Sequence, residues 1–112
     1  MRFMPLVRNG DFVRAYKRGK HIVHPQVVVY VNKNRGQGLR VGITCSKKAG
    51  KAVVRNRARR VIRQALVQTL SPNAGNVDVV LVARGQTPQL KSDRLAATLQ
   101  AILPKLGLPT NG

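Results

Sequence analysis

Acidic residues are almost absent from this sequence. Its 112 residues contain no glutamate and only three aspartates, Asp11, Asp78 and Asp93, against 21 lysines and arginines, for a net charge of +18. Two-metal phosphodiester cleavage needs several clustered carboxylates, so three scattered aspartates argue against intrinsic nuclease chemistry. Asp78 falls in an expected strand, where we expect it to pair with an arginine. The charge balance favours binding of a polyanion.

Other absences narrow the class of protein. The single cysteine, Cys45, cannot form an internal disulfide, which fits a reducing compartment, and we expect a cytoplasmic protein. No apolar run approaches the ~20 residues of a membrane-spanning helix, and residues 3–7 are too short for a signal peptide. A basic helix on a lipid surface is a weaker alternative, because its apolar face has few large residues. His21, His24 and Cys45 lack the close four-ligand spacing of structural zinc.

The periodicity predicts one α+β domain over residues 1–112. We expect an α-β-β-β-α-β-α sandwich, with helices packed on a four-stranded sheet and an ordered core over residues 9–104. Asn9 or Asp11 is expected to cap the first helix, and Gly19 to close it in a left-handed conformation. The strands are expected at residues 21–23, 27–33, 40–46 and 77–83, with a mobile basic turn at 32–38. The second helix is expected to end near Leu70, and the third to be capped by Ser92 and ended by Pro104. The tail from Gly107 is expected to be frayed.

The strongest pattern is a basic helix after the third strand. Residues 46–66 carry three lysines and five arginines without an acid. Like charges spaced three and four residues apart repel by a few tenths of a kcal/mol per pair, so we predict a face that a polyanion neutralises; a solubility face is the alternative. The polar face comprises Asn56, Arg59, Arg60 and Arg63, opposite an apolar stripe of Val54, Ala58, Val61, Ile62 and Ala65, with Arg55 and Arg57 at its edges.

Two further groups of residues point to binding. Lysines 47, 48 and 51 precede the basic helix, so that backbone N–H groups and the helix N-terminus can face phosphate. Phe12, Tyr16 and Tyr30 are three of only four aromatic residues. If the first helix packs on the sheet face that carries Tyr30, these rings line a groove for single-stranded nucleotides; the alternative is that they belong to the core.

The stretch from Arg40 to Arg63 resembles the signature of the protein subunit of bacterial ribonuclease P. From Ser46 it follows the frame S-K-K-x-G-x-A-V-x-R-N-R, in which residues 55–57 match the RNR motif of that family. The resemblance covers roughly residues 9–104. It implies a ribosomal-protein-like fold in which the RNR helix is a left-handed crossover between parallel strands.

The resemblance also implies a function. In that family the RNA subunit is catalytic, Mg²⁺ is held mainly by RNA, and the protein helps to remove the 5′ leader of precursor tRNA; the expected partners are ribonuclease P RNA and precursor tRNA, with no membrane and no obligate protein partner. A non-catalytic RNA-binding module of ribosomal type is the alternative. The expected RNA-subunit contacts are Lys47, Lys48, Lys51, Arg55, Asn56, Arg57, Arg59, Arg60 and Arg63, and the expected leader contacts are Phe12, Tyr16, Tyr30, Arg14 and Lys17.

Overall fold

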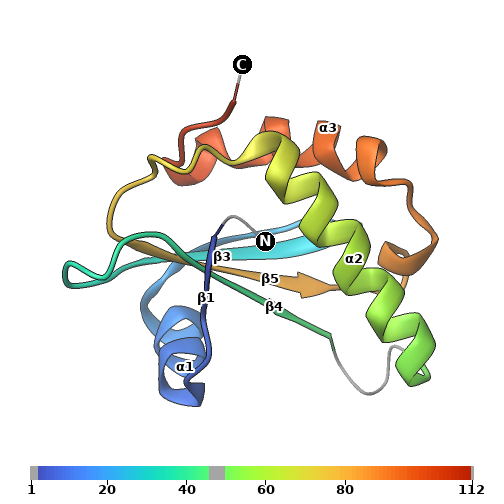
Figure 1. Cartoon of the computed structure of the whole chain (residues 1–112), viewed down its shortest axis with the longest axis horizontal. Coiled ribbons are helices and arrows are strands. Elements are labelled where there is room, and N and C mark those ends of the chain that lie inside the picture. The colour runs from blue at the N-terminus through green and yellow to red at the C-terminus, as the bar shows by residue number, and fades with distance from the viewer. Residues whose placement is uncertain (1–2, 46–49, 112) are drawn as a thin grey trace.

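A mixed β-sheet forms the centre of the structure, a computed structural model that describes residues 3–45 and 50–111 (Figure 1). The strand order is β1-β4-β5-β3-β2, with β1, β4 and β5 parallel to one another and the pairs β5–β3 and β3–β2 antiparallel. The elements in chain order are β1 (Met4–Pro5), α1 (Asn9–Arg18), β2 (Lys20–Val23), β3 (Val27–Lys33), β4 (Arg40–Thr44), α2 (Ala52–Thr69), β5 (Val77–Ala83), the 3₁₀ turn η2 (Thr87–Gln89), α3 (Ser92–Ile102) and the 3₁₀ turn η3 (Pro104–Leu106).

The two faces of the sheet carry different helices. Helices α2 and α3 cover one face and α1 covers the other (Figure 1). Strand β3 alternates as predicted, since Val27, Val29 and Val31 join the larger core under α2 and α3, whereas Tyr30 joins the smaller cluster under α1. Within the described residues, no helix is long and apolar enough to cross a lipid bilayer.

Helix α2 connects two neighbouring parallel strands, β4 and β5. In Figure 1 it lies above the sheet and β4 lies in front of β5, so that the β4–α2–β5 crossover is left-handed. Nearly all such crossovers are right-handed. The unusual hand that the resemblance implied is therefore present.

The sheet has one strand more than predicted. Strand β1 pairs parallel to β4 through Met4–Arg40 and Pro5–Val41, and the flanking Phe3 and Leu6 are buried. The prediction of four strands was therefore wrong, because it omitted the edge strand β1. Its two residues are too few to show an alternating pattern. The core also begins before residue 9, which was its expected limit.

The C-terminal tail is not frayed, contrary to the prediction. Gly107 adopts a left-handed conformation with φ of 78° and turns the chain back, and Leu108 is buried in the main core. The N–H of Asn111 donates a 2.7 Å hydrogen bond to the carbonyl of Thr69 at the end of α2. These contacts hold the tail against the second helix.

The predicted N-cap residues were wrong, whereas Gly19 is the C-cap of α1 as predicted, although not in the expected left-handed conformation. Arg8 and Lys91 are the N-cap residues of α1 and α3, and neither Asn9, Asp11 nor Ser92 makes a side-chain capping bond. Gly19 has an ordinary φ of −77°, so its glycine is not needed for a left-handed turn. A Cβ at this position would lie 2.6 Å from the carbonyl oxygens of both Ala15 and Val31, so close packing excludes a side chain there.

Candidate nucleic-acid interface

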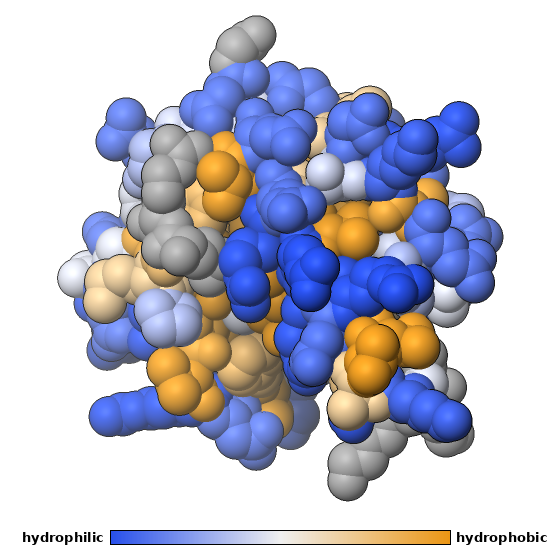
Figure 2. Space-filling model, turned by 45° about the vertical axis from the view of Figure 1, so that its right-hand side comes forward, coloured by the Kyte–Doolittle hydropathy of each residue, from blue (hydrophilic) through white to orange (hydrophobic). Residues whose placement is uncertain are grey.

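Helix α2 presents an uncompensated basic face, as its spacing predicted. Its apolar stripe is half-buried at Val54 and buried from Ala58 onward, with Ala58, Ile62 and Ala65 fully inaccessible. Figure 2 shows hydrophilic side chains gathered along α2 in the middle of this face. In the described part of the chain, no ion pair involves an arginine of α2. The exposed residues of this surface, called the α2 basic face below, are Asn56, Arg57, Arg60 and Arg63, with Arg59 half-buried beside them.

Arg55 lies at the edge of the α2 basic face and is half-buried. Its Nε is out of contact with solvent and has no hydrogen-bond partner among residues 3–45 and 50–111. A buried donor without an acceptor is costly, and arginine cannot lose its proton to relieve that cost. An oxyanion can accept from this atom only after the groups that cover it move aside. Lys51 is exposed as the N-cap of α2, whereas Lys47 and Lys48 lie outside the described residues.

On the opposite face of the sheet, two of the three predicted aromatic residues, Phe12 and Tyr16, line a hollow, whereas Tyr30 packs beside Tyr16 and does not line it. Helix α1 packs on the face that holds Tyr30, and the rings of Tyr16 and Tyr30 meet edge to face with centroids 4.9 Å apart. The Phe12 ring lies over Gly42, and a Cβ at this position would come within 2.6 Å of the ring, so a side chain there would displace Phe12. A hollow of about 310 Å³, called the aromatic groove below, is lined by Val7, Asn9, Phe12, Tyr16, Ile43 and Thr44.

The Tyr16 side chain remains available to a ligand, with 40% of the residue exposed. Burial raises the pKa of its phenol, the neighbouring Tyr30 raises that pKa further, and a hydrogen bond with the Thr44 side chain partly offsets both effects. Tyr16 is therefore neutral at physiological pH. A neutral phenol ring can stack on a base and does not repel phosphate.

His21 extends the aromatic row and was missed by the sequence analysis. Its ring stacks on Tyr30 with centroids 5.2 Å apart and an interplanar angle of 25°. The contact arises because His21 and Tyr30 are directly paired across β2 and β3. Only the register of this pair would have identified His21, since nothing in the sequence around His21 marks it as a neighbour of Tyr30.

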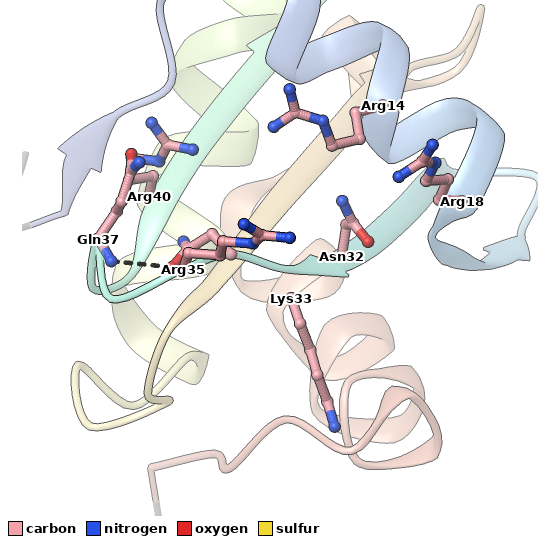
Figure 3. Close-up of a pocket in the computed structure, with 8 residues that line it drawn as sticks. Arg14, Arg18, Asn32, Lys33, Arg35, Gln37 and Arg40 are labelled. Atoms are coloured by element: carbon pink, nitrogen blue, oxygen red, sulfur yellow. Dashed lines mark hydrogen bonds between the residues drawn. The ribbon is translucent and has the colours of Figure 1, made fainter.

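Arg14 and Lys17 do not line the aromatic groove, although both were grouped with its rings. Lys17 is exposed on α1, and Arg14 lines a separate hollow on the other flank of the helix (Figure 3). Their contact with an RNA leader stays a prediction. The second hollow also contains Arg18, Arg35 and Arg40, which were not among the predicted site residues.

A buried ion cluster engages two of the three aspartates. Arg40 donates from Nε and Nη2 to the two carboxylate oxygens of Asp78, at 2.8 and 2.9 Å, which confirms the expected pairing of Asp78. Asp11 lies 3.4 Å from both Arg40 and Arg14. Within the described residues, no group of three or more acidic, histidine or cysteine side chains is placed to hold a metal ion.

Comparison with known proteins identifies the family of this chain. The family model for ribonuclease P matches residues 1–107. The ribonuclease P protein component of Bacillus velezensis is 36% identical over 107 residues, which cover 92% of this chain and 89% of that protein. That of Clostridioides difficile is 40% identical over 83 residues, 70% of each chain.

Solved structures show the same fold. The RNase P protein of Staphylococcus aureus superimposes with a TM-score of 0.73 at 30% identity, covering 90% of this chain and 93% of that one. The RNase P protein of Thermotoga maritima has a TM-score of 0.74 at 24% identity, covering 90% and 96%, and supports the fold. The family match, the relatives and the fold agree, and the chain belongs to the ribonuclease P protein family.

Proposed function

We propose that this chain binds the catalytic RNA of ribonuclease P through the α2 basic face and the 5′ leader of precursor tRNA through the aromatic groove. One observation carries the proposal: a single sheet separates an uncompensated basic helix from a row of accessible rings. The basic face suits the phosphate backbone of a folded RNA. The rings suit the unpaired bases of a leader, because single-stranded RNA is recognised largely by stacking.

The residues divide between the two surfaces. The rings of Phe12, Tyr16 and Tyr30, extended by His21, would hold leader bases. The proposed contacts with the RNA subunit are Lys47, Lys48, Lys51, Arg55, Asn56, Arg57, Arg59, Arg60 and Arg63.

The proposed contribution of the protein is electrostatic and positional. Each phosphate that an arginine neutralises releases counterions, so binding weakens as salt rises. The protein would hold the leader and neutralise nearby phosphates. This would reduce repulsion between the RNA subunit and precursor tRNA, so that the assembly needs less Mg²⁺. The metal would be held by the RNA, since both Asp11 and Asp78 are committed to arginines. In this account the RNA catalyses hydrolysis to a mature tRNA with a 5′-phosphate, and no side chain of the protein is catalytic.

The bacterial relatives support a cytoplasmic assembly of this protein with ribonuclease P RNA and precursor tRNA. Neither a membrane nor a further protein subunit is needed for the proposed activity.

Substitution of Tyr16 tests the leader-binding role. In the assembled holoenzyme, Tyr16→Ala should weaken binding of precursor tRNA by ~1–3 kcal/mol, roughly 5- to 150-fold, because one base is left without its stacking platform. Binding of mature tRNA, which has no leader, should be unchanged. Equilibrium binding of both tRNAs to the variant and to the native holoenzyme measures the difference.

Val13→Ala is the matched control, because Val13 is the next exposed apolar residue on α1, at 38% exposure against 40% for Tyr16. It should leave both affinities unchanged. Equal reductions for precursor and mature tRNA with Tyr16→Ala, or equal reductions with the two variants, would contradict a leader-binding groove.

A further inference from the structure

A second hollow lies on the same sheet face as the aromatic groove but on the opposite flank of α1. Its volume is about 420 Å³. Figure 3 shows Arg14, Arg18 and Arg35 pointing into the same space, whereas Lys33 points away from them. The lining, called the arginine hollow below, comprises Arg14, Arg18, Asn32, Lys33, Asn34, Arg35, Gln37 and Arg40.

The arginine hollow has no internal counterion for two of its arginines. The chain has only three acids. Asp11 and Asp78 pair with Arg14 and Arg40, and Asp93 lies on α3, across the sheet. In the described part of the chain, neither Arg18 nor Arg35 takes part in an ion pair or a side-chain hydrogen bond. Their guanidinium groups repel one another unless an anion lies between them.

The walls of the hollow are held in place by hydrogen bonds. Asn34 donates from Nδ2 to the Gly38 carbonyl at 2.8 Å and to Asp78 at 2.9 Å, and its own Oδ1 accepts from the N–H of Gln37 at 3.0 Å. The N–H of Gly38 donates to the Asn76 side chain at 2.9 Å. These bonds connect the turn that carries Arg35 to Asp78 of β5 and to Asn76. The expectation that the turn is mobile stays a prediction.

The arginine hollow is separate from the aromatic groove. The two hollows share no lining residue. Helix α1 stands between them with Ala15 fully buried against the sheet, Phe12 and Tyr16 on one flank, and Arg14 and Arg18 on the other. A helix with its side chains is about 10–12 Å across, so a strand stacked in the groove does not also fill the hollow.

We propose that the arginine hollow binds a backbone phosphate of a second RNA segment, distinct from the leader strand in the aromatic groove. Guanidinium groups bind phosphate oxygens in a bidentate manner, and the amide side chains of Asn32 and Gln37 offer further donors. The identification of the anion as RNA rests on the proposed function, whereas its identification as a phosphate rests on the hollow alone. Arg14 then contacts this second segment and not the leader.

The first experiment uses inorganic phosphate as the probe. Sodium phosphate is titrated into the isotopically labelled full chain at constant ionic strength, and NMR follows the side-chain amides of Asn32 and Gln37. We expect the chemical shifts of both amides to change saturably with phosphate concentration. The change should be abolished in the variant Arg18→Gln/Arg35→Gln. It should be retained in the control variant Lys91→Gln/Arg94→Gln, which removes two charges near α3. Both pairs are exposed and lack ion pairs among the described residues, so the fold should tolerate either change. Absent shifts, or equal shifts in the two variants, would overturn the proposal.

The second experiment separates this site from the leader site. Arg18→Gln/Arg35→Gln should weaken binding to ribonuclease P RNA alone about tenfold or more and lower its salt slope by about 1 or 2 relative to the control variant. The ratio of precursor to mature tRNA affinity should not change. A reduction seen only with leader-bearing tRNA would overturn the proposal by placing the hollow on the leader path. If Tyr16→Ala has no leader-specific effect while the phosphate shifts persist, the leader-binding proposal fails and the phosphate site stands.

Discussion

Replacing Arg59, Arg60 and Arg63 together with glutamine is expected to weaken binding of ribonuclease P RNA by roughly tenfold for each phosphate that the variant no longer binds. The estimate follows from about 1.5 kcal/mol or more for a hydrogen bond to a charged group. The slope of log affinity against log salt should fall by about 1 for each such phosphate. Fluorescence binding titrations at several salt concentrations measure both quantities.

The fold should survive this triple substitution. Glutamine has nearly the helix propensity of arginine, and removal of like charges relieves a repulsion of a few tenths of a kcal/mol per pair. The melting temperature should therefore stay level or rise.

A charge-matched variant shows whether position or net charge matters. Lys91→Gln/Arg94→Gln/Lys105→Gln removes three exposed positive charges from the α3 region. It should retain most of the affinity for the RNA. Equal reductions in affinity in the two triple variants would mean that the α2 basic face is not a binding surface and that only the net charge attracts RNA.

Replacing Arg40 with methionine is expected to lower the free energy of unfolding by about 3–5 kcal/mol. Asp78 is 2% exposed and takes two hydrogen bonds from Arg40, so the variant leaves a buried carboxylate without its cation. The hydrogen bond to Asp78 raises the pKa of Arg40 above its already high ordinary value, so this side chain is charged throughout the physiological pH range. Urea unfolding followed by circular dichroism measures the change in stability.

Two comparisons identify the cause of that destabilisation. Arg14→Met breaks only the 3.4 Å ion pair with Asp11, in which the arginine side chain is 55% exposed. It should lower the free energy of unfolding by less than about 1 kcal/mol. Adding Asp78→Leu to Arg40→Met removes both charges and should recover most of the stability, since apolar replacement of a buried pair is often neutral. A destabilisation no larger than that of Arg14→Met, or no recovery in the double variant, would contradict a buried ion pair at this position.

Elements with a long regular pattern were predicted well from the sequence. The buried and exposed faces of α2 follow the 3.6-residue period, because that helix packs one stripe on the sheet. Strand β3 alternates over seven residues, which placed Tyr30 on the face opposite Val29. The left-handed β4–α2–β5 crossover was predicted only from the family resemblance, since general packing rules favour a right-handed connection.

Features that depend on distant contacts were missed. Strand β1 is too short for a pattern, and the tail is fixed by a turn at Gly107 and by the end of α2. Gly19 matches a capping pattern, yet the nearby Val31 carbonyl is what excludes a side chain. The arginine hollow draws on α1, β3, β4 and the β3–β4 turn, so no single stretch of sequence shows it.

Reconstitution of the reaction tests whether this protein is the cofactor of a catalytic RNA. Precursor tRNA is incubated at low Mg²⁺ with this protein alone, with a bacterial ribonuclease P RNA alone, and with both. Efficient release of the 5′ leader is expected only in the combined reaction. Cleavage by the protein alone would contradict the assignment of catalysis to RNA. A silent combined reaction, with the protein still bound tightly to the RNA, would instead indicate an RNA-binding module without a role in cleavage.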